Sequence, residues 1–408
     1  MKSLPFLFVA LVMTAVAPRA LHAQQIEKTI LKWPDTGQTL SYTNVKGEDS
    51  DYQINVPAWR VRSAQTAEDK VTGLIWQRTD GGEMTFEAAR KYADTLTLDG
   101  EKGWRLPTLL EALSIVSMDR NNPALDTSVF TNTKAEYWWT SQEQPSNTTR
   151  VWVTNSGGGM GPHVKTETIS AGGTKKYQAR VVKTGMQSVM VEHYTDNGDS
   201  TVTDNVTGLM WQRYPARDSV PWETALTRAE EARIAGHDDW RLPNLKELGS
   251  LVDITRNAPA APLLFTMQSL RYWTSTAQFK QTANAWFVDF QNSGLTSYAA
   301  KVRSYPVILV RSTATATSIP DVSDTAPGAT AIAITPQPAS DLVSLHMPRT
   351  VHVHAIRVYS SCGLLMHERD HPHTATYLLA VSSWPAGVYA VEFLTDNDPI
   401  TSRFVVVR

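Results

Sequence analysis

An internal repeat limits what this chain can fold into more than any other feature of its sequence. The block Val71–Arg78 returns as Val206–Arg213, 135 residues later, with seven of its eight residues unchanged. Trp104–Pro107 returns as Trp240–Pro243, and three further blocks follow in the same order. Repeats of solenoid proteins are only about 20–50 residues long. The long period therefore indicates two whole domains in tandem.

Each copy contains sequence signals for two helices between short strands. Apolar residues at helical spacing predict the first helix. These residues are Phe86, Ala89, Ala93 and Leu96 in copy one, and Trp222, Ala225, Leu226, Ala229 and Ala232 in copy two. Thr108 and Glu111 predict a capping box at the second helix, with Asn244 and Glu247 in equivalent positions. With the short strand patterns that remain, each copy is predicted to be α+β with an antiparallel sheet.

The first 23 residues have the pattern of a signal peptide. A positive charge precedes Leu4–Ala17, an apolar stretch of 14 residues that is too short to span a bilayer. We expect cleavage between Ala23 and Gln24; an uncleaved anchor is the alternative. No later segment reaches 18 apolar residues. The mature chain is therefore predicted to be exported, without a transmembrane segment, and to begin with an extension over residues 24–66.

The charge balance and the cysteine count exclude several kinds of partner and site. The mature chain carries 36 basic and 40 acidic residues, so no basic excess is left to neutralise phosphates. Nucleic acid is not expected as a partner. The single cysteine, Cys362, excludes intrachain disulfides, CxxC redox chemistry and zinc sites with several thiolates. We expect no cofactor and no metal.

The repeated segments carry motifs that are similar to those of a known family. Copy two contains Thr-Gly-Leu-Met-Trp-Gln at 207–212, Asp-Trp-Arg-Leu-Pro-Asn-Leu-Lys-Glu-Leu at 239–248 and Tyr-Trp-Thr-Ser-Thr at 272–276. With these motifs, residues 67–184 and 189–312 resemble the C-terminal domain family of the Legionella collagen-like adhesin, Lcl. Segments 34–39 and 47–52 look like those that precede such domains. The resemblance implies two tandem C-type-lectin-like domains and surface-exposed, glycan-associated roles.

The composition changes after the repeats. Residues 313–330 are rich in Ser, Thr, Ala and Pro, which predicts a linker. Short strand patterns in residues 331–408 predict a small β-sandwich. Pro-Gln-Pro-Ala-Ser-Asp at 336–341 and Trp-Pro-Ala-Gly-Val-Tyr at 384–389 resemble motifs of the type IX secretion system C-terminal sorting domain. This resemblance implies that secretion machinery recognises the tail and exports the chain via the periplasm across the outer membrane, to the cell surface or the extracellular space.

Two aromatic residues are candidates for binding a glycan. Trp138 corresponds to Tyr272 in the repeat, and each precedes a tryptophan, Trp139 or Trp273. Adjacent residues of a strand face opposite ways. If Trp139 and Trp273 are buried, Trp138 and Tyr272 should be exposed and able to stack on sugar rings. The alternative is that all the paired aromatic residues belong to the core.

Repeated charged residues have both a functional and a structural interpretation. Arg105 and Arg241 could clamp a carboxylate or sulfate, or they could be internal ties. Glu111 and Glu247 could act as acid and base, but their cap positions favour a structural role. Other patterns suggest a metal: calcium at 48–51 or at 196–201, and a shared ion at His352 and His354. We favour a structural interpretation of each: a polar turn at 48–51, a hairpin at 196–201 and a solvated strand face at His352 and His354.

These features predict an exported, non-enzymatic surface or extracellular protein whose two lectin-like modules bind a glycan or mediate adhesion. A structural envelope protein without a ligand is one alternative. Another is an enzyme on a fold like that of formylglycine-generating proteins. This alternative is disfavoured because the one thiol of the chain lies in the tail.

Overall fold

The architecture is mainly β. The computed structural model describes residues 25–185, 188–312, 333–335, 342–346, 353–360, 364–370, 376–381, 384–396 and 399–407. Of these residues, 39% lie in strands and 10% in helices. The expected α+β class with two tandem C-type-lectin-like domains is therefore wrong. The signal peptide with its cleavage site at Ala23 and Gln24, the linker, and Cys362 lie outside the described residues.

Each repeat contains a four-stranded antiparallel sheet built in the same way. The strand order is β2-β3-β4-β9 in repeat 1 and β11-β12-β13-β17 in repeat 2. The bounds in repeat 1 are Trp59–Val61, Thr66–Asp69, Leu74–Gln77 and Val182–Thr184. Those in repeat 2 are Tyr194–Asp196, Thr201–Asp204, Leu209–Gln212 and Val310–Ser312. In both repeats a strand from the end of the copy closes the sheet.

A second sheet in each repeat carries the long strands. Its order is β7-β6-β5-β8 in repeat 1 and β14-β15-β16 in repeat 2. The strands of repeat 1 are β5 (Tyr137–Gln144), β6 (Asn147–Thr154), β7 (Met160–Val164) and β8 (Tyr177–Gln178). Those of repeat 2 are β14 (Arg271–Gln278), β15 (Gln281–Asp289) and β16 (Leu295–Ala300).

The described residues contain four α-helices, and all of them are short. The first helix of each repeat is α1 (Phe86–Thr95) or α3 (Trp222–Glu230). The second helix is α2 (Leu109–Ser114) or α4 (Leu245–Ser250) and has only six residues. Both predicted capping boxes are confirmed: the N-cap side chain accepts from the N3 backbone, and the N3 glutamate accepts from the N-cap backbone. Because the helices are this short, strands make up most of the regular secondary structure, and the fold is mainly β.

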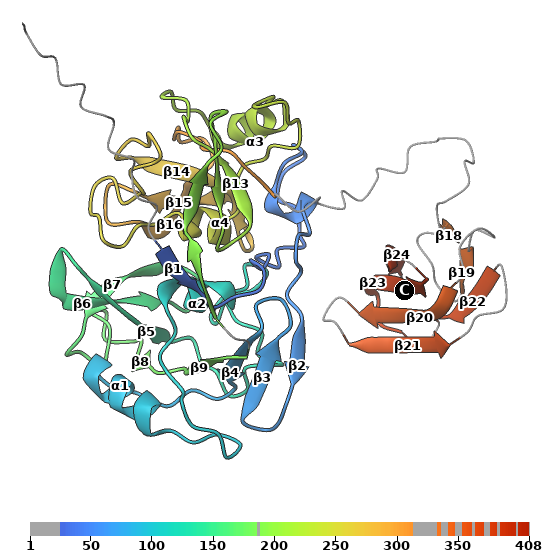
Figure 1. Ribbon diagram of the computed structural model, residues 1–408, viewed down its shortest axis with the longest axis horizontal. Coiled ribbons are helices and arrows are strands. Elements are labelled where there is room, and N and C mark those ends of the chain that lie inside the picture. Colours follow the sequence, from blue (N-terminus) through green and yellow to red (C-terminus); the bar gives the residue numbers. More distant parts are fainter. Residues whose placement is uncertain are drawn as a thin grey trace, which may run out of the picture.

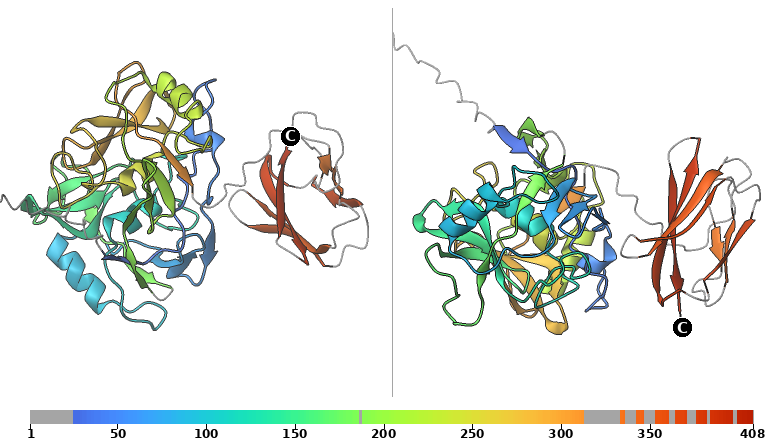
Figure 2. Two further views of the ribbon diagram at one scale, coloured as in Figure 1. Left: turned by 45° about the horizontal axis from the view of Figure 1, so that its top comes forward. Right: turned by 90° about the horizontal axis from the view of Figure 1, so that it is seen from below.

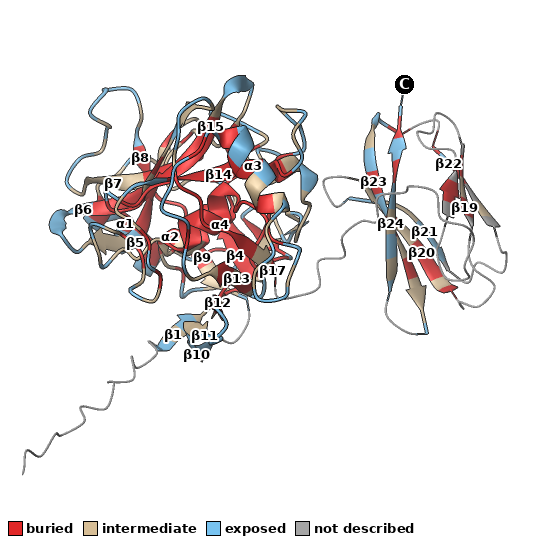
Figure 3. Cartoon of the chain, turned by 90° about the horizontal axis from the view of Figure 1, so that it is seen from above, coloured by how far each residue is buried: buried red, intermediate tan, exposed pale blue. Residues whose placement is uncertain are grey.

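The two repeats share one hydrophobic core. One continuous cluster contains Trp76 and Leu113 of repeat 1, Trp211 and Leu248 of repeat 2, and Trp33 of the N-terminal segment. Figure 1 shows α2 and α4 at the centre of this body, and Figure 3 shows the buried residues gathered around them. Each repeat leaves an apolar face that the other repeat covers.

Contacts between the repeats pair structural counterparts. Helix α2 contacts α4, and β7 contacts β16. A Cβ atom added to Gly249 of α4 would lie 2.6 Å from Cδ2 of Leu113, its own counterpart in α2. Met160 donates its backbone N–H to Oγ1 of Thr296, again its counterpart, at 2.8 Å. Counterparts meet in this way around a two-fold axis, so an approximate two-fold rotation relates the repeats.

The N-terminal segment packs against both repeats. Strand β1 (Gln25–Lys28) pairs with β10 (Val189–Glu192), which lies in the connection between the repeats. Residues after β1 cross the shared core, and a 3₁₀ turn, η1 (Asp49–Asp51), reaches β14 of repeat 2. The segment therefore contributes buried contacts to the core that the two repeats share.

The tail forms a separate β-sandwich with its own core. One sheet has the order β18-β19-β22 and the other β21-β20-β23-β24. Their bounds are Ala333–Thr335, Leu342–His346 and Thr376–Ala380 in the first, and Leu365–Asp370, Val353–Ser360, Gly387–Thr395 and Ile400–Val406 in the second. Figure 2 shows the sheets as two layers, and buried residues such as Val343, Val391 and Phe404 fill the space between them.

Replacing Gly249 with its counterpart residue should test the shared core. Gly249→Leu should overpack the contact with Leu113 and lower the free energy of unfolding by roughly 1–3 kcal/mol. Because both repeats use one core, amide hydrogen exchange should become faster in α2 as well as in α4. Urea unfolding and exchange mass spectrometry measure these effects.

Gly172→Leu is the matched control for this change. Gly172 is exposed, and the nearest atom to an added Cβ is 4.0 Å away. This variant should unfold like the wild type. Faster exchange confined to repeat 2 in Gly249→Leu would contradict a shared core.

Candidate functional site

The two repeated arginines are bound to the two repeated glutamates. Arg105 donates two hydrogen bonds to the carboxylate of Glu111, both at 2.6 Å. Arg241 does the same to Glu247, at 2.5 and 2.6 Å. The same carboxylates accept the N-cap N–H of α2 and α4. Both arginines therefore form salt bridges within the chain, and neither guanidinium is free to bind a ligand.

The predicted exposure of Trp138 and Tyr272 is wrong. Trp138 is 5% exposed, and its Nε1 donates to Oδ1 of Asp80 at 2.9 Å. Tyr272 is fully buried, and its hydroxyl accepts the backbone N–H of Gln268 at 2.9 Å. Neither ring can stack on a sugar.

Both faces of the second sheet are covered, which explains this error. Trp139 faces the cluster under α1, whereas Trp138 faces the core shared by the repeats. In repeat 2, Trp273 and Tyr272 divide in the same way between the cluster under α3 and the shared core. Adjacent residues do face opposite ways, but the second helix of the same repeat packs on the second face, α2 against β5 and α4 against β14.

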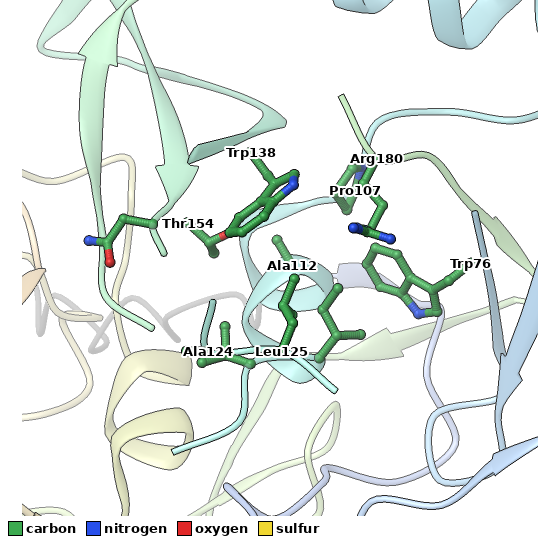
Figure 4. A pocket seen from close by; sticks show the side chains of 11 residues that line it. Trp76, Pro107, Ala112, Ala124, Leu125, Trp138, Thr154 and Arg180 are labelled. Atoms are coloured by element: carbon green, nitrogen blue, oxygen red, sulfur yellow. The ribbon is translucent and has the colours of Figure 1, made fainter. Parts of the chain in front are cut away.

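A small cavity beside Trp138 is too small to bind a ligand. Its volume is about 10 Å³, and Figure 4 shows Trp76, Trp138 and Arg180 around it. This is room for one water molecule at most. Arg180 is buried, paired with Asp80, and stacked with its guanidinium carbon 4.5 Å from the Phe130 ring centre. This ion pair was not predicted from the sequence. It exists in repeat 1 alone because Ile308 replaces the arginine in repeat 2.

The N-terminal segment brings a buried polar cluster onto α4. Nζ of Lys246 donates to the backbone oxygens of Asp35, at 2.6 Å, and Ser114, at 2.8 Å. Asp49 accepts hydroxyl hydrogen bonds from Thr36, at 2.7 Å, and Thr276, at 2.6 Å. Hydroxyl donors therefore surround the carboxylate of Asp49, one of the acidic residues of the candidate calcium segment at 48–51.

Burial shifts the ionisation of this cluster. It raises the pKa of Asp49 to about 7, although the hydrogen bonds from Thr276 and Thr36 lower it. It raises the pKa of Asp35 well above the usual value, and the nearby charge of Asp49 raises it further. It lowers the pKa of Lys246 to about 8, against the attraction of Asp35. The cluster holds the N-terminal segment against α4, and its contribution to the free energy of unfolding depends on pH.

Other charged patterns have structural roles. Asp196 and Thr201 lie on β11 and β12, so the segment between them is the predicted hairpin. Glu48 is buried and accepts from Gln38 at 2.9 Å and from the backbone N–H of Tyr42 at 2.7 Å. His354 lies beside Asp396, whereas His352 is outside the described residues.

A cleft lies between the two repeats, and we call it the inter-repeat cleft. Its volume is about 270 Å³. Repeat 1 contributes the loop after α2 and the turn between β6 and β7; repeat 2 contributes the end of β14 and the neighbouring faces of β15 and β16. The lining residues are Met118, Arg120, Asn121, Asn122, Asn155, Ser156, Gly157, Gln278, Phe279, Trp286, Thr296, Ser297 and Tyr298.

Amides and aromatic rings dominate the walls of the inter-repeat cleft. Trp286 is nearly buried, and Tyr298 packs edge-on against it with ring centres 5.6 Å apart. Tyr298 itself is 48% exposed. Asn155 uses its oxygen internally, accepting from Gly157 and Gly159, both at 3.0 Å. Its amide N–H groups and the side chains of Asn121 and Asn122 have no hydrogen-bond partner in the described part of the chain, so they can bind a polar ligand.

Comparison with known families gives matches in three parts of the chain. Residues 65–183 and 200–311 match the Lcl C-terminal domain. Residues 333–407 match the secretion system C-terminal sorting domain. Both resemblances noted in the sequence are thereby confirmed. A search of curated proteins found no match.

The buried cluster predicts an unusual pH dependence of stability. Between about pH 4 and pH 7, folded Asp49 holds a proton that the unfolded chain has released. Its contribution to the free energy of unfolding therefore falls as the pH rises through this window. Lys246 acts in the opposite direction above about pH 8.

Asp49→Asn should remove the part of this dependence that belongs to Asp49, because an amide cannot ionise. From about pH 5 to about pH 8, the wild type should lose roughly 1–2 kcal/mol more stability than the variant. Urea unfolding at both pH values measures this difference. Equal losses in the two proteins would contradict the assignment.

Proposed function

Since the chain belongs to the Lcl C-terminal domain family, we propose that it is a non-enzymatic, adhesin-like protein that binds a glycan in the inter-repeat cleft. The sorting tail directs its export across the outer membrane to the cell surface or the extracellular space. Among the described residues, no helix has both the length and the apolar character to cross a membrane.

The composition of the inter-repeat cleft is the observation that supports a glycan ligand. Sugars present hydroxyl groups that both donate and accept hydrogen bonds, and apolar C–H faces. The amides of Asn121, Asn122 and Gln278 supply donors and acceptors. Phe279 and Tyr298 supply aromatic surface at the same opening. Since a buried aromatic floor and a polar rim are typical of small-ligand sites, this cleft replaces Trp138 and Tyr272 as our candidate site.

The environment of the repeated carboxylates supports a non-enzymatic role. An acid–base pair needs at least one carboxylate that can exchange a proton with a substrate. Glu111 and Glu247 are buried, and each is held by an arginine and by the backbone of its own helix. Binding, rather than proton transfer, is the function we assign to the repeats.

Deleting residues 331–408 should abolish export. The deleted chain should accumulate inside the cell, because the sandwich that carries the sorting domain is missing. Fractionation followed by immunoblotting measures its location. The repeats have their own core, so the retained protein should still be folded, as judged by protease resistance. Release at the wild-type level would contradict a sorting role for the tail.

The exported chain should bind glycans on an array. We expect modest affinity, because the cleft covers little more than one sugar ring at about 270 Å³, near the lower end of small-molecule sites. The Tyr298→Ala variant should bind less, and its melting temperature should stay unchanged because Tyr298 is half-exposed. Arg90→Ala, at an exposed position on α1 far from the cleft lining, is the control. Absence of any glycan signal would refute the proposed function.

A further inference from the structure

We infer that the outer face of the four-stranded sheet of the tail carries the surface by which the secretion machinery binds this chain. That face holds an apolar patch, which we call the tail patch. It consists of Tyr359, Leu365, Val388, Ala390 and Val405. The occupant is a protein of the machinery that presents an apolar surface of its own. This inference rests on the sorting role of the tail and names the part of the tail that is bound.

The inner and outer faces of this sheet are distinguished by burial. The inner side chains of β23 and β24 fill the tail core and are Tyr389, Val391, Phe393, Phe404 and Val406. Successive residues of a strand point to opposite faces. Val388, Ala390 and Val405 therefore lie on the outer face, and all three are exposed. The apolar side chains of the tail patch take no part in the core of the sandwich.

The pairing of the strands makes the tail patch continuous. Val388 of β23 lies opposite Val405 of β24. Tyr359 of β20 lies opposite Ala390 of β23 on one side and opposite Leu365 of β21 on the other. Ala390 and Val388 are two residues apart on one strand, so they are neighbours on the same face. The patch therefore extends across all four strands of the sheet.

Three aliphatic residues of the tail patch are strongly exposed to solvent. The exposed fraction is 44% for Leu365, 43% for Val388 and 36% for Val405. A single exposed aliphatic side chain is ordinary, whereas neighbouring ones on one face mark a site of protein interaction. Removing this surface from water would stabilise a complex with an apolar partner. The patch is thus suited to a partner that covers several strands at once.

Charged side chains beside the tail patch are paired with groups of the same face. Arg357 donates from Nε to Oε1 of Glu368 at 2.7 Å. The hydroxyl of Tyr359 donates to Oε2 of Glu392 at 3.2 Å, which leaves its ring within the patch. These hydrogen bonds already use the charged groups at this border. The patch itself therefore offers a partner apolar contact rather than charge.

The place of Val388 in the sequence connects the tail patch with sorting. Val388 belongs to the motif at 384–389, which resembles a motif of the sorting domain. Trp384 and Tyr389 of this motif pack in the tail core, and the Tyr389 hydroxyl donates to the backbone oxygen of Pro385 at 2.7 Å. Those residues have structural roles, whereas the side chain of Val388 faces outward. Since residues 333–407 match the sorting domain, we assign the exposed patch to its recognition.

The double variant Val388→Thr, Val405→Thr tests the tail patch. Threonine keeps the branched shape and the strand preference of valine, so the tail should fold normally. Each change replaces one methyl group of the patch with a hydroxyl. Because two buried methyl groups are worth about tenfold in affinity, export should become about tenfold slower. Pulse labelling of the full chain followed by cell fractionation measures the export rate, and thermal unfolding of the purified mature chain checks the fold.

Two further double variants serve as controls. Val61→Thr with Val302→Thr makes the same chemical change at exposed valines of the repeats, where the exposed fractions are 52% and 82%. This chain should be exported at the wild-type rate. Val388→Ile with Val405→Ile keeps the tail patch apolar and should also be exported like the wild type. Equal slowing by the isoleucine and threonine changes would contradict an apolar contact.

The outcomes separate the tail patch from the sorting role of the tail. Wild-type export of the threonine variant, with export abolished by deletion of residues 331–408, would overturn the patch and leave the sorting role intact. Export of the deleted chain would overturn both. Analytical ultracentrifugation tests a second copy as the occupant. A wild-type dimer that the threonine changes convert to a monomer, with unchanged export, would assign the patch to self-association and overturn this inference.

Discussion

The arginine–glutamate pair of each repeat holds together the elements on which the rest of the fold depends. Arg105 exchanges backbone hydrogen bonds with Val182 of β9, and its side chain holds the glutamate that caps α2. Arg241 joins β17 to α4 in the same way. One residue thus links the closing strand of a sheet to the start of the helix at the two-fold axis. In each pair both carboxylate oxygens accept from the guanidinium, which offsets the cost of burying the glutamate.

Local features of this structure could be predicted from the sequence, and non-local ones could not. The capping boxes follow from residues three positions apart, and the hairpin at 196–201 follows from its turn residues. The burial of Trp138 and Tyr272 could not be predicted, because alternation along a strand does not reveal that the second helix of the repeat covers the other face. The inter-repeat cleft has walls from Asn121 and Tyr298, far apart in the chain. A signal for it did exist: the copies differ at Pro145 and Phe279, and at Pro162 and Tyr298.

Divergence between the copies has replaced polar with apolar contacts in some places and added polar contacts in others. Arg180 with Asp80 in repeat 1 corresponds to Ile308 and Pro215 in repeat 2, where apolar packing fills the same region. Lys246 in α4 corresponds to Leu110 in α2, and the N-terminal segment covers the lysine alone. The ion pair of repeat 2 is therefore more deeply buried, with 5% of the Arg241 side chain exposed against 37% for Arg105. The scaffold is symmetric, but its electrostatics are not.

The position of the N-terminal segment also determines the order in which the chain can fold. Asp49 binds Thr276, which lies 227 residues later, and Gln38 binds the backbone of Ala277, 239 residues later. Such distant contacts close large loops and form slowly. During synthesis, the first part of the mature chain emerges long before its partners in β14 exist. The residues made first are therefore among the last to reach their native positions, and the body cannot close until nearly all of repeat 2 has been made.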